Sequence, residues 1–244
     1  MSLTSAAEIA MAQEIQQSFA RKSKPTHYTV EYAARSLCAR KLSGDYYDFL
    51  DISAGRMAFV LADISGKGLP AALLMASLRA SILAQRPDAF NNLPRTLKRV
   101  HELFYESSPP GHFASLFFAH YNERSGCLRY VNCGHVPPIL FRDDGQVARL
   151  GSTAPVVGML ENWNATVDEV ALSPGDVLVI FSDGVIEAKN TAADDFGSDR
   201  LIQVVRNRFY LKPVYLAETV IQAVEVFSGF RRQDDATVVV VRVR

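Results

Sequence analysis

The sequence predicts an α+β sandwich, in which helices lie outside two stacked antiparallel β-sheets in an α-β-β-α arrangement. Strand-like segments follow one another as hairpins, which favours antiparallel pairing. Helical segments come in pairs and do not alternate one by one with strands, so a doubly wound parallel sheet fits poorly. The 244 residues, 48% of them apolar, are enough for one large domain with a substantial core.

The first part of the chain predicts one helix, three strands and two further helices. An apolar stripe predicts the first helix over residues 6–19. The strands expected next are 28–34, 46–52 and 57–62. The first two alternate between apolar and polar residues and are expected to be half-buried, and Ser53-Ala54-Gly55 suits a hairpin turn before the third. Helices are expected at 69–83, with Pro70 in the first turn, and at 93–106.

Strands dominate the middle of the chain, and helices return near its end. The strands expected in the middle are 113–121, 127–132, 138–142 and 147–150. Asp143-Asp144-Gly145 suits the turn of a hairpin between the last two. An apolar strand at 177–181 then precedes helices at 198–209 and 214–227, and a last strand covers 236–243.

Composition limits the classes of function. Lys plus Arg equals Asp plus Glu at 26 each, so no global basic field attracts nucleic acid or an anionic membrane. The three cysteines form neither a C-x-x-C pair nor an even set, which indicates reduced thiols in the cytoplasm. No apolar run reaches the roughly 20 residues of a membrane span, and no signal peptide is visible. We therefore expect a cytoplasmic protein that binds neither nucleic acid nor membrane.

Four aspartates stand beside strand-like segments: Asp45, Asp63, Asp183 and Asp234. Carboxylates brought together repel one another unless protons or a metal compensate them, and oxygen-only ligands select Mg²⁺, Mn²⁺ or Ca²⁺. Two such ions about 3.5–4 Å apart can bridge a water and hold a phosphoryl oxygen for displacement. Taken singly, each of these aspartates is more often a turn former than a ligand, and spacing alone does not show that they converge.

Five motifs together resemble a known family: Ser-Gly-Asp-Tyr-Tyr-Asp (43–48), Ala-Asp-Ile-Ser-Gly-Lys-Gly-Leu-Pro-Ala-Ala-Leu-Leu-Met-Ala (62–76), Asn-Cys-Gly-His-Val-Pro-Pro (132–138), Phe-Ser-Asp-Gly-Val-Ile-Glu-Ala (181–188) and Gln-Asp-Asp-Ala-Thr (233–237). In order and spacing they resemble the stage II sporulation protein E-like branch of the metal-dependent protein phosphatases (PPM), the bacterial relatives of protein phosphatase 2C. The resemblance runs from about residue 12 to the C-terminus, and it implies the same two-sheet fold.

The resemblance also implies a two-metal centre for Mn²⁺ or Mg²⁺. Its ligands would be the carboxylates of Asp45, Asp63, Asp183 and Asp234 and the backbone carbonyl of Ile64. Asp235 would orient Asp234 or a metal-bound water, or else hold an extra ion. Asp48 and Asp51 are expected to be sheet-surface or hydrogen-bonding residues.

Lys67 departs from the pattern, because many relatives carry histidine at this place. A lysine with the usual pKa of about 10.4 is a poor proton donor at neutral pH, so no general acid is assigned. Lys67 is expected either to aid phosphate binding or to be a solvated loop residue. His135 is expected to brace its turn.

The resemblance implies a cytoplasmic serine/threonine phosphatase that uses a metal-bridged water to dephosphorylate an anti-sigma-factor antagonist. The alternative is a catalytically silent module that docks regulatory proteins; a metal-dependent nuclease would need a basic groove. Residues 1–24 are expected to form a linker or regulatory helix and residues 25–244 the phosphatase domain. An upstream sensory domain is expected to be absent from this chain, and a homodimer through the N-terminal helix is plausible.

Overall fold

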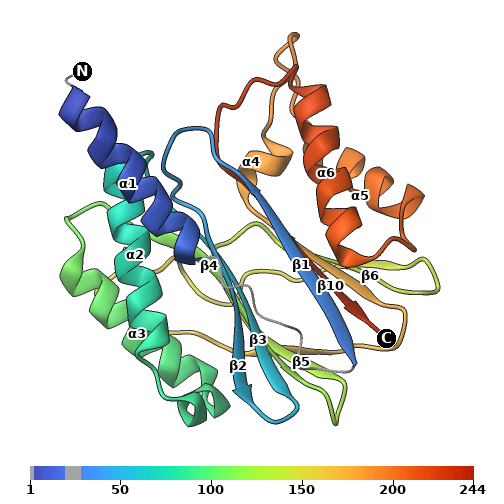
Figure 1. The fold of residues 1–244 in the computed structure, drawn as a ribbon. Coiled ribbons are helices and arrows are strands. Elements are labelled where there is room, and N and C mark those ends of the chain that lie inside the picture. The colour runs from blue at the N-terminus through green and yellow to red at the C-terminus, as the bar shows by residue number, and fades with distance from the viewer. Residues whose placement is uncertain (1–2, 20–28) are drawn as a thin grey trace.

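Two five-stranded antiparallel sheets pack face to face, with helices on their outer faces (Figure 1). The computed structural model describes residues 3–19 and 29–244. The first sheet consists, in spatial order, of β1 (Val30–Leu37), β10 (Ala236–Val243), β9 (Val177–Phe181), β6 (Ile139–Phe141) and β7 (Val147–Arg149). The second consists of β2 (Tyr46–Ser53), β3 (Arg56–Ile64), β4 (Ala114–Asn122), β5 (Cys127–Cys133) and β8 (Asp168–Ala171). The predicted α+β sandwich is therefore confirmed.

The helices form two groups, one outside each sheet. The group on the second sheet is α2 (Leu69–Leu83), the short 3₁₀ helix η1 (Pro87–Asn91) and α3 (Leu93–Ser107). The group on the first sheet is α4 (Asp183–Ile186), α5 (Gly197–Asn207) and α6 (Pro213–Phe227). The N-terminal helix α1 (Leu3–Phe19) lies beside α2 (Figure 1), where the ring of Phe19 contacts the Arg79 guanidinium at 4.6 Å.

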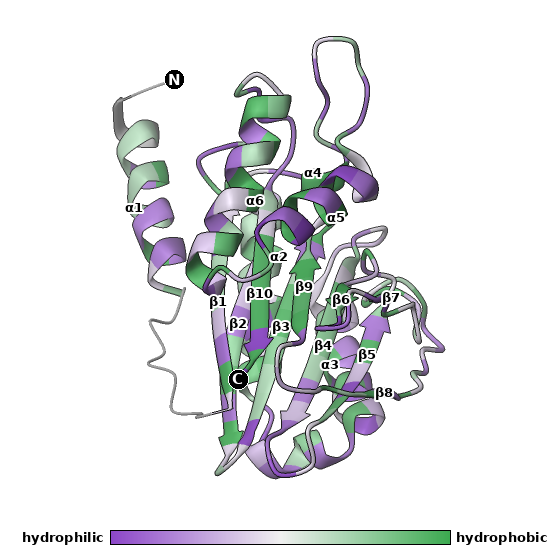
Figure 2. Ribbon diagram, turned by 90° about the vertical axis from the view of Figure 1, so that its right-hand side faces the viewer, coloured by the Kyte–Doolittle hydropathy of each residue, from purple (hydrophilic) through white to green (hydrophobic). Residues whose placement is uncertain are grey.

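Three apolar layers hold these parts together. The central layer lies between the sheets and includes Phe59, Phe117 and Val239, all fully buried. Each outer layer lies between one sheet and its helices. Strands β9 and β10 are hydrophobic along most of their length (Figure 2), because both of their faces are covered.

The sequence misjudged several local features. Strand β2 is largely buried, not half-buried, because Phe49 faces the central layer while Leu50 packs in the outer layer with the helices. The strand β8 and the helices η1 and α4 were not predicted at all. The start of the expected strand 28–34 and the expected boundary between residues 24 and 25 lie outside the described residues; β1 continues to Leu37.

The register brings the motif residues to one end of the sandwich. Tyr46 at the start of β2 pairs with Ala62 near the end of β3. In the other sheet, Phe181 at the end of β9 pairs with Val238 near the start of β10. Segments that precede or follow these positions therefore meet at the same end of both sheets. No helix among residues 3–19 and 29–244 is long and apolar enough to cross a membrane.

Candidate metal centre

Five aspartates from four segments lie at this shared end of the sheets: Asp45, Asp63, Asp183, Asp234 and Asp235. Asp45 precedes β2, and Asp63 is the next-to-last residue of β3. Asp183 begins α4 one residue beyond Ser182, which follows β9, and the pair Asp234-Asp235 immediately precedes β10. Each strand end thus fixes the main chain beside one or two carboxylates.

Asp45 is the most enclosed of the candidate ligands. Its side chain is 8% exposed, and Oδ2 accepts hydrogen bonds from Ser182 Oγ at 2.7 Å and Thr237 Oγ1 at 2.6 Å. Its other oxygen, Oδ1, is buried and has no hydrogen-bond partner among the described residues. Burial, followed by the charge of Asp63, raises the pKa of Asp45 well above its usual range. A buried carboxylate oxygen without a donor fits a bound cation.

Asp63 and Asp183 share this electrostatic environment. Burial, then the charges of Asp183 and Asp234, raise the pKa of Asp63 to about 7. Burial, then the charge of Glu187, raises the pKa of Asp183. The ionised carboxylates therefore repel one another, and a divalent cation would relieve the repulsion as protons do.

A cleft of about 290 Å³ brings part of the candidate set together. Asp63, Asp183 and Asp234 line it with Ile64 and Lys67. The Ile64 carbonyl oxygen borders Gly44, where an added Cβ would lie only 3.3 Å from it, so the turn before Asp45 runs close to the end of β3.

The structure does not bring all the candidate ligands to one point. Asp45 borders a separate hollow of about 300 Å³ on the side of α1. No three histidine, cysteine, aspartate or glutamate side chains within the described ranges are arranged to enclose an ion as they stand. The donor set still fits Mg²⁺ or Mn²⁺, because it consists of carboxylates and a main-chain carbonyl. Enclosing an ion would require the carboxylates to move.

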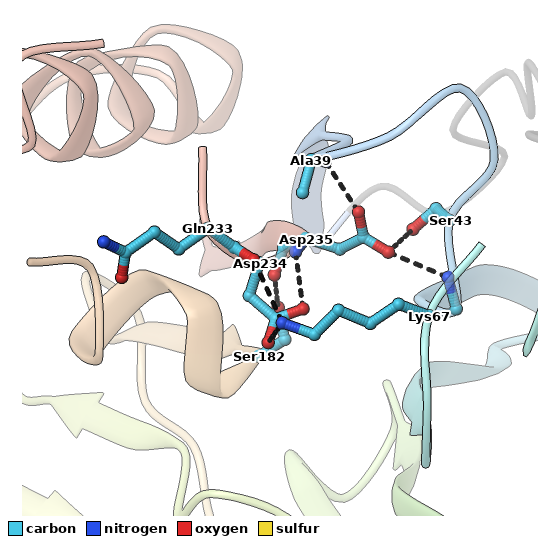
Figure 3. Close-up of polar contacts among 8 residues, drawn as sticks. Ala39, Ser43, Lys67, Ser182, Gln233, Asp234 and Asp235 are labelled. Carbon is cyan, nitrogen blue, oxygen red and sulfur yellow. Dashed lines mark hydrogen bonds and ion pairs between the residues drawn. The ribbon is translucent and has the colours of Figure 1, made fainter. Parts of the chain in front are cut away.

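Asp235 holds the turn that carries Asp45. Its Oδ1 accepts the main-chain N–H of Ala39 at 2.7 Å, and its Oδ2 accepts Ser43 Oγ and Gly44 N–H, both at 2.8 Å (Figure 3). Asp235 contacts Asp234 through its main chain, whose N–H donates to Asp234 Oδ1 at 3.0 Å. The Asp235 carboxylate therefore positions the segment before β2.

The two other acidic residues of the first motif region lie as expected for hydrogen-bonding or surface residues. Asp48 is buried and accepts hydrogen bonds from Tyr46 Oη at 3.1 Å and Phe49 N–H at 2.8 Å. Asp51 is exposed on β2.

Lys67 contacts the candidate metal centre directly. Its Nζ lies 2.5 Å from Asp234 Oδ2 and donates to the Gln233 carbonyl at 3.0 Å (Figure 3). Lys67 therefore pairs with Asp234. The sequence had suggested either phosphate binding or a solvated loop residue, and neither role includes this contact.

His135 is buried behind the cleft wall. Its Nδ1 lies 2.7 Å from Ser115 Oγ, and its main-chain N–H donates to Asn132 Oδ1 at 2.8 Å. Burial lowers the pKa of His135 to about 4, so the imidazole is neutral near pH 7. These contacts agree with a histidine that braces its turn.

Three residues that contact the site were not singled out from the sequence. Ser182 and Thr237 donate to Asp45, and the motifs contain both of them beside an aspartate, which is the signal that could have found them. Gln16 of α1 is the third: its Nε2 donates to the Ser43 carbonyl at 2.8 Å, and Ser43 N–H donates to Gln16 Oε1 at 3.0 Å. No sequence pattern predicts that a helix side chain pairs with this loop.

Comparison with known proteins covers four of the five motifs by a family match and nearly the whole chain by relatives. The family described as stage II sporulation protein E (SpoIIE) matches residues 53–244. Protein IcfG of Synechocystis sp. is 28% identical over 260 residues, which cover 96% of this chain and 41% of IcfG. The phosphoserine phosphatase RsbU of Bacillus subtilis is 25% identical over 236 residues, which cover 96% of this chain and 70% of RsbU.

Solved structures share the fold. The SiaA-PP2C domain of Pseudomonas aeruginosa has a TM-score of 0.84 at 18% identity, over 98% of this chain and 97% of that domain. The catalytic domain of the serine/threonine phosphatase PstP, in complex with two manganese ions, has a TM-score of 0.65 at 16% identity, over 88% of this chain and 98% of that domain. The fold is therefore that of the PP2C-type phosphatases. Within this class, the chain belongs to the stage II sporulation protein E (SpoIIE) family.

The close approach of α4 to the Asp234-Asp235 segment gives a structural prediction. A Cβ added at Gly184 would clash with the main-chain carbonyl of Asp235. Gly184→Ala should therefore displace this segment and lower the free energy of unfolding by about 1–3 kcal/mol, the usual range for overpacking. Chemical denaturation measures the change. Gly151→Ala is the matched control, because nothing lies within 4 Å of a Cβ at Gly151; equal stability of the two variants would contradict the close packing.

The raised pKa values predict a pH dependence of the metal-free protein. An unfolded aspartate ionises near pH 3.9, whereas Asp63 in the fold does so near pH 7, so the folded state keeps protons that the unfolded state has released in between. The stabilisation that comes from proton binding by folded Asp63 is therefore complete below about pH 3.9, and it is lost as the pH rises toward about 7. The pKa of Asp45 is raised as well, by burial and then by the charge of Asp63, so Asp45 adds to the loss and Asp45→Asn should reduce it.

In EDTA at pH 7.5, Asp45→Asn should raise the midpoint of thermal unfolding by about 2–4 °C, and the difference should narrow toward pH 5. Differential scanning calorimetry at both pH values measures it. A difference that stays constant with pH would show that Asp45 is not part of a repelling cluster.

Proposed function

We propose that this chain is a metal-dependent serine/threonine phosphatase that removes phosphate from a regulatory protein by means of a water activated between two Mn²⁺ or Mg²⁺ ions. The observation that carries the proposal is that aspartates from four segments lie at one end of the two sheets, where the buried Oδ1 of Asp45 has no donor among the described residues. The SpoIIE family match and the two manganese ions of the PstP structure support it.

The proposed ligands are Asp45, Asp63, Asp183 and Asp234, with the main-chain carbonyl of Ile64. When bound, two divalent ions would lower the pKa of a shared water and withdraw charge from the phosphoryl oxygens. The chain's own residues position the ligands: Ser182 and Thr237 orient Asp45 through its Oδ2 and leave Oδ1 for an ion. Asp235 fixes the turn on which Asp45 stands.

The substrate we infer is a phosphoserine or phosphothreonine on an anti-sigma-factor antagonist. Two relatives, RsbU and RsbP of Bacillus subtilis, are described as phosphoserine phosphatases, and RsbP is 28% identical over 60% of this chain. The cleft that holds Asp63, Asp183 and Asp234 is open on the surface, as access by a phosphorylated side chain of another protein requires.

Asp183→Asn tests the reaction. Hydrolysis of p-nitrophenyl phosphate and of a phosphoserine peptide should require Mn²⁺ or Mg²⁺, stop in EDTA, and fall at least about 100-fold in the variant, because a proposed ligand is lost. Steady-state rates measure the effect. Asp51→Asn, which changes an exposed aspartate of β2, is the control and should keep the wild-type rate.

The same assay separates the phosphatase from the alternative, a catalytically silent docking module. If the wild type neither hydrolyses these compounds nor binds Mn²⁺ in calorimetry, the phosphatase proposal fails and the docking module is favoured.

We also propose that residues 1–24 form a regulatory segment whose helix α1 controls the turn at Ser43. The paired hydrogen bonds between Gln16 and the Ser43 main chain support this, because Ser43 lies two residues before Asp45. The exposed side chains of Met11 and Ile15 on the same helix, 65% and 53% accessible, support a homodimer formed through α1.

Gln16→Ala should loosen the turn that carries Asp45 and lower kcat about three- to tenfold, with little change in the midpoint of thermal unfolding. Metal titration of the activity should show a matching loss of apparent Mn²⁺ affinity. Gln17→Ala, at an exposed neighbouring position, is the control. If both variants behave alike, the contact between Gln16 and Ser43 does not control the site.

A further inference from the structure

Lys67 contacts one of the proposed metal ligands and lines the cleft that contains two others. Lys67 stands between β3 and α2, and its Nζ contacts both Asp234 Oδ2 and the Gln233 carbonyl (Figure 3). The same side chain lines the cleft together with Asp63 and Asp183. One ammonium group therefore neutralises the exposed end of the aspartate cluster.

With this contact, each oxygen of the Asp234 carboxylate accepts a hydrogen bond. Its Oδ2 accepts from Lys67 at 2.5 Å, and its Oδ1 accepts from the main-chain N–H of Asp235 at 3.0 Å. Asp45 differs, because both donors to its carboxylate reach Oδ2 and leave Oδ1 without a partner among the described residues. Of these two proposed ligands, only Asp234 has a cationic partner on its carboxylate.

A lysine ammonium and a metal ion cannot use the same carboxylate oxygen independently. The ammonium is a donor of three hydrogens with no lone pair, so it cannot act as a ligand. A divalent ion placed on Asp234 would lie within a few ångströms of the ammonium and be repelled by it.

We propose that the Lys67 side chain competes with a metal ion for the Asp234 carboxylate. Its ammonium group binds Asp234 in the metal-free protein and leaves it when a divalent cation binds at that end of the cleft. The proposal rests on the proposed two-metal function. The proposal predicts that the ion at Asp234 is bound with the lower affinity of the two, and that Lys67 determines how low this affinity is.

The loop permits this exchange without a change of fold. Ser65 anchors the loop, because its N–H donates to the Phe113 carbonyl at 2.9 Å and its Oγ accepts Phe113 N–H at 2.9 Å. The side chain of Lys67 is 41% exposed, so its flexible stem can swing into solvent while the anchored main chain stays in place.

Calorimetric titration with Mn²⁺ tests the proposal, with the wild type compared with Lys67→Met and Lys67→Arg. Methionine keeps the stem and removes the charge, so the weaker Mn²⁺ site should tighten about three- to tenfold. Arginine keeps the charge and should keep an affinity close to that of the wild type. Lys189→Met is the charge-matched control, because Lys189 pairs with Asp195 at 2.6 Å and should leave Mn²⁺ affinity unchanged.

The same substitution made in an Asp234→Asn protein distinguishes competition for Asp234 from a general effect of removing a positive charge. In Asp234→Asn, Lys67→Met should no longer tighten Mn²⁺ binding, because the contested carboxylate is gone. Unfolding midpoints in EDTA confirm that each variant is folded.

The outcomes separate the two proposals. If the wild type binds Mn²⁺ but Lys67→Met binds it equally or more weakly, the lysine proposal is overturned and the two-metal function stands. An equal gain from Lys189→Met, or a gain that persists in Asp234→Asn, also overturns it. If the wild type binds no Mn²⁺, both proposals fail.

Discussion

Burial of the Asp45 carboxylate is the constraint on which the rest of the site depends. Asp45 precedes a strand of one sheet, yet one of its hydroxyl donors, Thr237, lies in β10 of the other sheet and the second, Ser182, directly follows β9 of that sheet. An ionised carboxylate enclosed in this way is stable only when hydrogen bonds and opposite charge compensate it. The hydroxyls provide part of the compensation, and Oδ1, which has no donor among the described residues, is left to be balanced by a proton or a cation. Asp45 therefore joins the two sheets and is the place where a cation would replace a proton.

Asp235 holds the main chain around Asp45 in place. The segment from residue 38 to 45 connects β1 of the first sheet with β2 of the second, and Asp235 binds three donors along it. Gly184 packs against the Asp235 carbonyl so closely that no side chain fits between them. The turns that carry Asp45, Asp183 and Asp234 are thus fixed to one another through Asp235, so the movement that encloses an ion would be rotation of the carboxylate side chains and not displacement of these turns.

The sequence predicted the features that depend on repeated patterns and missed those that depend on single contacts. Long apolar strands such as 177–181 and 236–243 were found with their observed bounds, because covered strands leave a continuous apolar run. The edge strand β8, with the sequence Asp-Glu-Val-Ala, has no such run, and Tyr130 of the neighbouring strand helps to hold it through a hydrogen bond to Asp168 at 2.9 Å.

In the candidate site, too, the sequence predicted the residues that belong to motifs and missed the contacts between single side chains. Motifs located the aspartates, since each aspartate stands beside a strand end. They did not show that Gln16 pairs with Ser43 or that Lys67 pairs with Asp234, because the partners are 27 and 167 positions apart. A single side-chain contact across such a separation leaves no periodic trace, so only the folded structure reveals it.

The two ends of the aspartate cluster differ in how their charge is balanced. At the buried end, Asp45 is 8% exposed and is bound by hydroxyls that are themselves buried. At the open end, the Asp234 side chain is 42% exposed and is bound by a long, flexible cation. Changes at Ser182 or Thr237 would leave a buried group unsatisfied and weaken the contact between the sheets. Changes at Lys67 alter the charge at the cleft mouth and leave the core intact. Under the proposed two-metal function, substitution at position 67 would therefore change the affinity for the metal while the fold stays the same.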